Sequence, residues 1–469
     1  MKKLSLGLIA LLVSMTLFAE RVSREDAALV ANHFMNVVSP NTNVRMAAPA
    51  KKMVLKTTAE ENMYYLYENE DGEGWVIIAA NDAVMPILAY SETGHFRTDN
   101  MPSNVRAWMG KYNDFIQQIE ADGVAAGEET AARWNALRKS SRKATDYGNV
   151  IVGPLVKTAW DQDDPYWNLC PSTGSGTRIS RAYTGCVATA MAQVMKYWEW
   201  PKQGKGSLTY QPLDPNSDAG AKSKRYGELS ADFGATTYAW ESMRNKYKGS
   251  ATITETQKTA VATLMYHCGV ATQMRYGNAA DGGSGTMTVN YGDPSWGLTD
   301  TGEGGCAENA LPNFFRYKKP TGYMRDGYSY WGTTYYKKWT EADWTAMLKA
   351  ELDKKHPIMY GGEGSGGGHS FVCDGYTDKD YFHFNWGWSG DNDGYYLLSN
   401  LTPGSGGAGG GSYSFSQNQD VIIGIEPDYT QGIEDVEAEG ETAQKWLIDG
   451  RVVIVRGDNV YSIFGQKIQ

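Results

Sequence analysis

Residues 184–198 read TGCVATAMAQVMKYW and predict a helix that begins at a cysteine. Apolar residues recur at helical spacing, at Val187, Met191, Val194, Met195 and Trp198. Pro201 ends the pattern, so Cys186 lies in or just before the first turn. Free backbone N–H groups and the helix dipole favour an anion there, and we expect the thiol pKa to fall. The segment therefore suits a thiolate nucleophile, although an inert buried cysteine would give the same pattern.

A second segment, residues 366–376, reads GGGHSFVCDGY and supplies a histidine. Residues 370–388 read as two strands joined by turn chemistry at 377–380, which predicts an antiparallel hairpin. In that register His369 lies opposite residues 386–388. An amide there can orient the imidazole, and an indole can shield an ion pair from water. A half-buried structural histidine is the alternative interpretation.

Three separated segments carry a family resemblance. TGCVATAMAQVMKYW, GGGHSFVCDGY and FHFNWGWSGDNDGYY resemble, in order and spacing, segments of the streptopain family of papain-like cysteine peptidases, including its interpain-type members. The resemblance runs from about Val152 to Pro427. It implies a secreted endopeptidase made as an inactive zymogen, with Cys186 as nucleophile and His369 as general base and acid. It also implies an α+β fold with a helical lobe and an antiparallel β lobe, preceded by an α+β inhibitory prodomain.

The resemblance implies further site residues. Trp386 and Trp388 would support the active site, and Asn385 is a third candidate because papain-type enzymes orient the histidine with an asparagine. Gly368, beside the histidine, and Gly282 correspond to substrate-binding positions. Glycine suits such positions because an extended peptide can hydrogen-bond to exposed backbone.

Two details of the site stay open. The backbone N–H of Cys186 is the expected oxyanion donor, and the second donor is not identifiable from the sequence. Streptopain has a glutamine in the strand before the glycine-rich loop, whereas this chain has Gly361 at the aligned position. This departure puts any role of that side chain in doubt.

The 469 residues divide into four expected parts. Lys2 and Lys3 precede an apolar run that ends in the small residue Ala19, as in a signal peptide. The region after Pro427 is acidic and then forms short strands, resembling C-terminal tails of proteins exported across an outer membrane. The expected parts are a signal peptide (1–19), an inhibitory propeptide (20–143), a papain-like peptidase domain (144–428), and a linker with a β tail that is a candidate sorting segment (429–469).

The propeptide has its own structural pattern. Residues 23–34 predict a capped helix, residues 63–68 and 75–79 two strands, and residues 104–120 another helix. By resemblance this segment inhibits the peptidase within the same chain. The basic, polar region 138–146 is the expected place of activation cleavage, within about ten residues on either side.

The rest of the peptidase region predicts one more helix and two loops. Residues 255–270 carry an amphipathic helical pattern. Residues 279–305 are rich in Gly, Asp, Thr and Ser without periodicity and read as a long loop at the substrate site. The glycine-rich residues 404–411 are expected to form a mobile flap.

Composition limits the partners and cofactors. A formal net charge of −10 disfavours nucleic acid and anionic membranes, and after the first segment no apolar run is long enough to span a membrane. Five cysteines leave at least one thiol free, and six histidines show no metal-ligand spacing, so no metal or other cofactor is expected. Residues 391–394 read as a hairpin turn and lack a full calcium-loop pattern. The expected partners are protein or peptide substrates and the chain's own propeptide, with a monomeric mature enzyme.

Two other functions use the same residues. A thiol acyl-transfer enzyme, such as an amidase or a transglutaminase, would apply the same Cys-His pair to another acyl donor. A non-catalytic surface adhesin on a peptidase scaffold would not need a thiolate. Peptide cleavage distinguishes the first from a peptidase, and thiol reactivity tests the second.

Overall fold

The computed structural model describes residues 20–37, 51–57, 62–99, 101–139, 148–174, 179–217, 221–250, 252–292, 305–330, 333–364, 367–398, 419–430, 444–448, 451–456 and 459–462. The chain forms two compact units, Met1–Pro427 and Asp428–Gln469. No helix among the described residues combines the length and the apolar composition needed to cross a membrane.

The N-terminal segment of the larger unit packs helices against antiparallel strands. Its elements are α1 (Arg24–Val37), β1 (Met53–Thr57), β2 (Tyr64–Asn69), β3 (Trp75–Ala79), β4 (Ile87–Ser91), α2 (Ser103–Ala121) and α3 (Glu128–Arg138). Ser23 caps α1 by accepting a hydrogen bond from the backbone N–H of Asp26. The two helices and two strands expected here are confirmed, whereas β1, β4 and α3 were not predicted.

A helical lobe follows. Its elements are β6 (Ser172–Thr173), β7 (Ser180–Arg181), α4 (Cys186–Trp198), β8 (Ser207–Tyr210), β9 (Leu229–Asp232), η2 (Trp240–Ser242), α5 (Glu255–Ala271), η3 (Ala279–Asp281) and α6 (Ala307–Phe314). Thr254 and Gln257 form a capping box at the start of α5, which matches the predicted helix. α4 begins at the cysteine, as expected.

The third part is mainly antiparallel sheet. Its elements are β5 (Val150–Val152), β10 (Thr321–Met324), β11 (Tyr328–Tyr330), β12 (Thr333–Tyr336), α7 (Glu341–Asp353), β13 (Ile358–Gly364), β14 (Gly367–Thr377), β15 (Tyr381–Asn385), β16 (Gly394–Leu397) and β17 (Gln419–Ile423). β14 and β15 form the predicted antiparallel hairpin, with Val372 opposite Asn385. β15 ends at Asn385 rather than at Trp388, because Gly387 has a φ of 74°, which extended backbone does not adopt.

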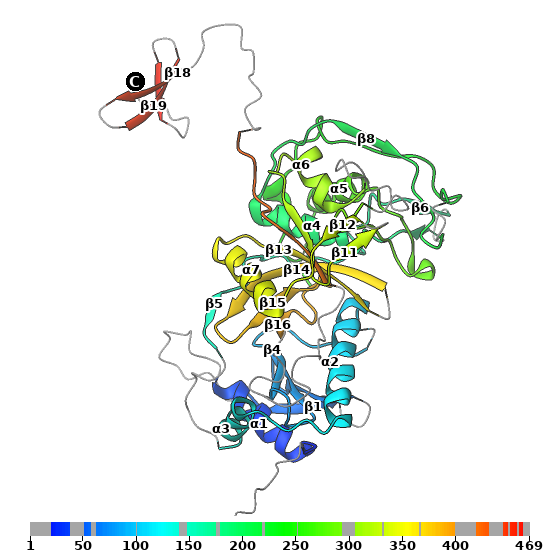
Figure 1. Ribbon diagram of the computed structural model, residues 1–469. Coiled ribbons are helices and arrows are strands. Elements are labelled where there is room, and N and C mark those ends of the chain that lie inside the picture. Colours follow the sequence, from blue (N-terminus) through cyan, green and yellow to red (C-terminus); the bar gives the residue numbers. More distant parts are fainter. Residues whose placement is uncertain are drawn as a thin grey trace, which may run out of the picture. The chain divides into compact units, whose positions relative to one another are not determined.

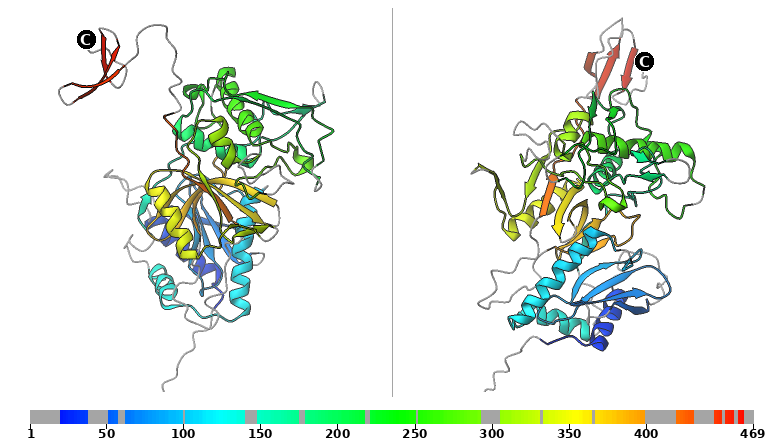
Figure 2. Two further views of the ribbon diagram at one scale, coloured as in Figure 1. Left: turned by 45° about the horizontal axis from the view of Figure 1, so that its top comes forward. Right: turned by 90° about the vertical axis from the view of Figure 1, so that its right-hand side faces the viewer.

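One sheet joins the N-terminal segment to the β lobe. In the described part of the chain its strand order is β1-β2-β3-β4-β16-β15-β14-β13-β17-β10, and β5 also pairs with β14. β4 and β16 meet through Tyr90 opposite Tyr395 and Ala89 opposite Tyr396. Figure 1 shows the yellow and orange strands between the blue N-terminal segment and the green helical lobe, and both views of Figure 2 keep this order.

The central strands separate two hydrophobic cores. Side chains on the face toward the helical lobe share a core with Cys186, namely Met359, Val372 and Ile422. Side chains on the other face share a core with the N-terminal segment and α7, namely Tyr360, Phe371 and Val421. A residue's place along each strand therefore decides which core it joins.

The smaller unit contains β18 (Gln444–Ile448), β19 (Arg451–Arg456) and β20 (Asn459–Ser462), paired antiparallel in that order. These are the short strands predicted for the tail. The expected signal peptide (1–19), the flap (404–411) and most of the cleavage region (residues 140–146 of 138–146) lie outside the described residues.

Candidate active site

Cys186 is the first residue of α4, and the residue before it has to be glycine. Gly185 is the N-cap, with a φ of 88° in the left-handed region that favours glycine. A Cβ at this position would lie 2.8 Å from the Sδ of Met274. The chain thus turns into the helix directly at the cysteine, and a larger residue at 185 would disturb that turn.

Burial raises the pKa of the Cys186 thiol, whereas the sequence led us to expect a decrease. Backbone hydrogen bonds at Ser370, Val187 and Cys186 itself favour the thiolate, and the negative charge of Asp420 disfavours it. The helix start supplies the expected donors, but desolvation is the larger effect. The residue is only 8% exposed, and its thiol is neutral at pH 7.

His369 lies on the face of β14 that points away from the thiol. β13 and β14 pair without a register shift, with His369 opposite Gly362. Side chains alternate along such strands, so His369 shares a face with Phe371, and Ser370 faces the helical lobe. The two cores agree, because Phe371 packs in the core of the N-terminal segment. On this register the imidazole of His369 and the thiol of Cys186 lie toward different faces of β14, and the pairing expected from the sequence remains a prediction.

Burial also lowers the pKa of His369 to about 4. An imidazole that is largely removed from solvent favours its neutral form. The thiol of Cys186, at the start of α4, and the imidazole of His369, on β14, are thus both in their neutral forms.

Helix α2 of the N-terminal segment packs on residues 386–388, the tryptophan segment. The ring of Trp386 is fully buried, with its centroid 4.4 Å from that of Phe371 and 6.1 Å from that of Trp108. Trp388 Nε1 donates to Asn104 Oδ1 at 3.1 Å, and Asn104 Nδ2 donates to the Trp386 carbonyl at 3.2 Å. The two tryptophans proposed from the sequence are therefore held by the N-terminal segment.

Asn385 connects β15 to the helical lobe. Its Nδ2 donates to the Thr158 carbonyl at 2.6 Å, and its Oδ1 accepts from Gln193 Nε2 at 3.0 Å and from the Gly387 N–H at 3.1 Å. Gln193 belongs to α4, two turns after Cys186. These bonds use both the donor and the acceptor side of the amide.

The two glycines proposed as substrate positions lie in different settings. Gly368 is part of β14, next to His369, and pairs with Glu363. Gly282 ends η3 with a φ of 81°, and no atom lies within 4 Å of the place a Cβ would take. The backbone at Gly282 therefore has open space above it.

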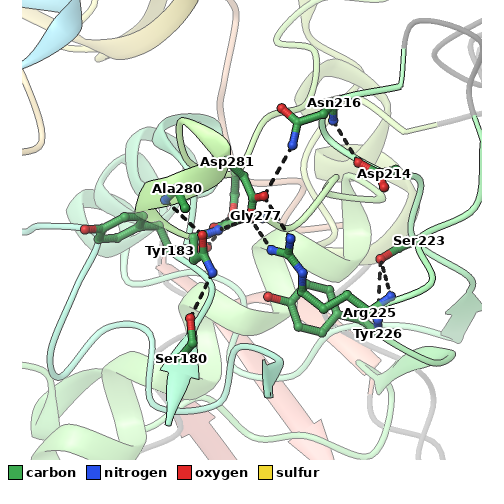
Figure 3. Close-up of polar contacts among 12 residues, drawn as sticks. Ser180, Tyr183, Asp214, Asn216, Ser223, Arg225, Tyr226, Gly277, Ala280 and Asp281 are labelled. Atoms are coloured by element: carbon green, nitrogen blue, oxygen red, sulfur yellow. Dashed lines mark hydrogen bonds and ion pairs between the residues drawn. The ribbon is translucent and has the colours of Figure 1, made fainter. Parts of the chain in front are cut away.

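Figure 3 shows the carboxylate of Asp281, the residue before Gly282, between its hydrogen-bond partners. It forms an ion pair with Arg225, and its Oδ1 also accepts from Asn216 Nδ2 at 3.3 Å. Its Oδ2 accepts from the backbone N–H of Asn278 at 2.9 Å. The hydrogen bonds from Arg225 hold the pKa of Asp281 below its ordinary value.

Further bonds tie this loop to the residues that lead to Cys186. The Tyr183 N–H donates to the Gly277 carbonyl at 3.1 Å, and Ser284 Oγ donates to the Tyr183 carbonyl at 2.7 Å. Met274 and the Ser284 carbonyl border Gly185. The position of the loop and the turn before the thiol are thus coupled.

Asp420 is a charged residue near the thiol that the sequence reasoning missed. Gly361 pairs with Asp420 on one side and with Ser370 on the other. A Cβ at Gly361 would lie 2.8 Å from the Cγ of Asp420, so the carboxyl group occupies the space above this glycine. An acid within the apolar run QDVII, residues 419–423, is the sequence signal that could have found it.

The described residues contain no group of three or more His, Cys, Asp or Glu side chains that could hold a metal ion. In the turn at 391–394, Asp391 pairs with Arg97 and Lys248, and Asp393 accepts the Trp386 N–H at 2.8 Å. The five cysteines are all buried and free. These contacts give the acidic turn a structural role.

Comparisons with known proteins agree with this architecture. Residues 160–396 match the model of the peptidase C10 family, and residues 19–116 match the Spi protease inhibitor model. The chain is 31% identical to the thiol protease/hemagglutinin PrtT of Porphyromonas gingivalis over 90% of its own length, and it spans 44% of that relative. It is 29% identical to streptopain of Streptococcus pyogenes, covering 77% of this chain and 80% of streptopain. The structure of Prevotella intermedia prointerpain A is similar with a TM-score of 0.55 at 31% identity, covering 80% of this chain and 98% of that one.

Proposed function

Because the chain belongs to the peptidase C10 family, we propose that it cleaves bonds within proteins through a thioester on Cys186, with His369 as general base and acid. The family match over residues 160–396 spans both residues, and this observation carries the proposal. The inhibitor match over residues 19–116 makes the chain a zymogen that its own propeptide inhibits. We further propose that the protein is secreted and that the mature enzyme is a monomer.

The chemistry follows from the two side chains. In the active state the proton of the Cys186 thiol passes to His369, and the thiolate attacks the scissile carbonyl. The backbone N–H of Cys186 donates to the oxyanion, and the His369 imidazolium protonates the leaving amine. The same imidazole then removes a proton from water, which hydrolyses the thioester.

Latency follows from the position of the histidine. With His369 on the other face of β14, the thiol cannot pass its proton directly to the imidazole, and we propose that activation brings the imidazole to the Cys186 face. The N-terminal segment packs on the face away from Cys186, where α2 bonds to Trp386, and β4 extends the sheet at β16. Gly367 and Gly368 precede His369 on β14, and glycine backbone adopts conformations that other residues rarely do. We place the activating cut within the basic region 138–146.

The test is cleavage of denatured casein by purified residues 20–469 under reducing conditions, with the mass of the protein followed in parallel. The wild type should cleave casein and trim itself within 138–146. Cys186→Ala should do neither. Cys306→Ser is the matched control, because serine is a favoured residue at the N-cap that Cys306 occupies on α6, and it should remain active.

Other outcomes would change the assignment. Self-processing by Cys186→Ala would exclude Cys186 as the nucleophile. An active thiol that modifies glutamine or free amides but leaves casein intact would support the amidase or transglutaminase alternative. A thiol that stays unreactive after the propeptide is removed would support a binding role.

A further inference from the structure

Asp420 presents a carboxylate on the same sheet face as the thiol. It lies on β17, opposite Gly361, and Gly361 lies opposite Ser370. Directly opposite residues of antiparallel strands point to one face, and Ser370 faces the helical lobe. Asp420, Gly361 and Ser370 therefore form one row across the sheet on the side of Cys186.

The missing side chain at Gly361 lets this carboxylate approach β14. The Cγ and Oδ2 of Asp420 lie 2.8 and 2.9 Å from the place a Cβ of residue 361 would take. Neighbouring strands are about 4.8 Å apart, so the carboxyl group lies about one strand spacing from Ser370. Asp420 is partly exposed, and its negative charge acts on the thiol of Cys186.

Other charged and titratable groups lie near Asp420 in the described part of the chain. Its charge also acts on the phenols of Tyr336 and Tyr360, whose pKa values burial raises and which stay neutral at working pH. Arg325 donates to the side chain of Gln419, whose place in the strand puts it on the other face of β17. Glu308 accepts the N–H groups of Asn290 and Gly322.

Activation changes what lies next to this carboxylate. The proposed mechanism requires His369 to move to the Cys186 face, where Ser370 now points. An imidazole on that face would lie near the carboxylate of Asp420, because Gly361 has no side chain to separate them. The imidazole becomes a cation when it takes the thiol proton, and a cation beside a carboxylate is stabilised.

We propose that Asp420 is a positioning residue that stabilises the imidazolium of His369 in the active enzyme. The inference rests on the proposed function. In the step it serves, the S–H bond of Cys186 breaks and an N–H bond forms on His369, while the carboxylate of Asp420 stays ionised and transfers no proton. The negative charge of Asp420 disfavours the Cys186 thiolate and favours the His369 imidazolium. The two ions therefore coexist at higher pH than they would without Asp420.

The test is the pH dependence of kcat/KM for the mature enzyme, prepared from the full chain. Asp420→Asn keeps the shape of the side chain and should move both limbs of the profile down by about one pH unit. This shift should lower kcat/KM on the alkaline side roughly tenfold. Asp420→Glu should retain the position of both limbs.

Glu426→Gln is the matched control, since it removes one negative charge from the same segment, where Glu426 pairs with Lys318 at the surface. Its profile should be unchanged. The rate at which iodoacetamide alkylates Cys186 as a function of pH is a second readout, which does not depend on turnover. It should show the same downward shift in Asp420→Asn.

Three results would overturn the inference. The limbs of Asp420→Asn could stay at their wild-type positions, or Glu426→Gln could shift them equally. Alternatively, Asp420→Asn could change only the preference between lysine- and glutamate-containing peptides, which would assign Asp420 to substrate charge selection. A wild type without peptidase activity would instead contradict the proposed function itself, so the two failures are distinguishable.

Discussion

At the scale of single residues, burial overrides the local chemistry that the sequence displays. The start of α4 supplies N–H donors to Cys186, yet desolvation keeps the thiol protonated. The same effect holds His369 neutral. A sequence pattern identifies which groups can react, whereas the fold decides the state in which they are stored.

The histidine should report this state directly. The pKa of His369 is about 4 in the latent form, below its ordinary 6.5, so this form binds fewer protons than a form with an exposed histidine. The stability of the latent form therefore falls as the pH drops through the window from 6.5 to 4. An NMR titration of the Cys186→Ala zymogen, with His369 assigned through His369→Gln, should give a midpoint near 4. A midpoint near 6.5 would contradict a buried imidazole.

The ion pair between Asp281 and Arg225 should affect substrate binding more than chemistry. Asp281→Asn removes the charge that holds the loop of Gly282, so we expect KM to rise several-fold with a smaller change in kcat. Lys318→Gln, at the surface pair with Glu426, is the control and should leave both constants unchanged. The measurement is steady-state kinetics of the mature enzyme. A fall in kcat at constant KM would show that the loop does not serve binding.

The sequence predicted which residues matter at the site. It did not predict to which face of the sheet their side chains point. Cys186 and His369 stand out by motif, but the face on which His369 lies depends on pairing with Gly362, which no local pattern reveals. Asp420 escaped notice because its importance depends on Gly361, about sixty positions earlier in the chain. Both errors concern contacts between distant segments.

At the scale of elements, periodicity predicted most of the helices and strands near the site. α2, α4 and α5 follow their amphipathic patterns closely. α3 was missed because only Thr130, Trp134 and Leu137 are buried in an otherwise polar segment. β15 was predicted too long because aromatic composition continues past the turn at Gly387.

Helix α2 should control the rate of activation. Asn104 bonds to both tryptophans of the segment beside β15, so Asn104→Ala removes two hydrogen bonds of about 1 kcal/mol each. We expect conversion of the zymogen to be roughly tenfold faster. The loss of full-length protein on gels measures this rate. Gln118→Ala, on the exposed side of α2, is the control and should convert at the wild-type rate. Equal rates for both variants would show that this contact does not limit activation.

At the scale of the whole larger unit, the propeptide and the peptidase share one sheet. Tyr90 lies opposite Tyr395 across the junction, a pairing between segments about three hundred residues apart. Composition suggested two neighbouring domains, because it cannot show that β4 continues the sheet at β16. A propeptide that only covers the peptidase and a propeptide that adds strands to its sheet would behave differently after the activating cut.

The shared sheet predicts that a cut alone does not release the propeptide. Besides the β4–β16 pairing, Tyr112 donates to the Leu397 carbonyl at 2.7 Å and Tyr381 to the Ile87 carbonyl at 2.8 Å. A protease added to the Cys186→Ala zymogen should cleave within the basic region 138–146 and leave a noncovalent complex. Size-exclusion chromatography should show both fragments in one peak, which denaturant separates. If the propeptide eluted separately straight after cleavage, the covalent linker would be what holds it, and the sheet would have no part in latency.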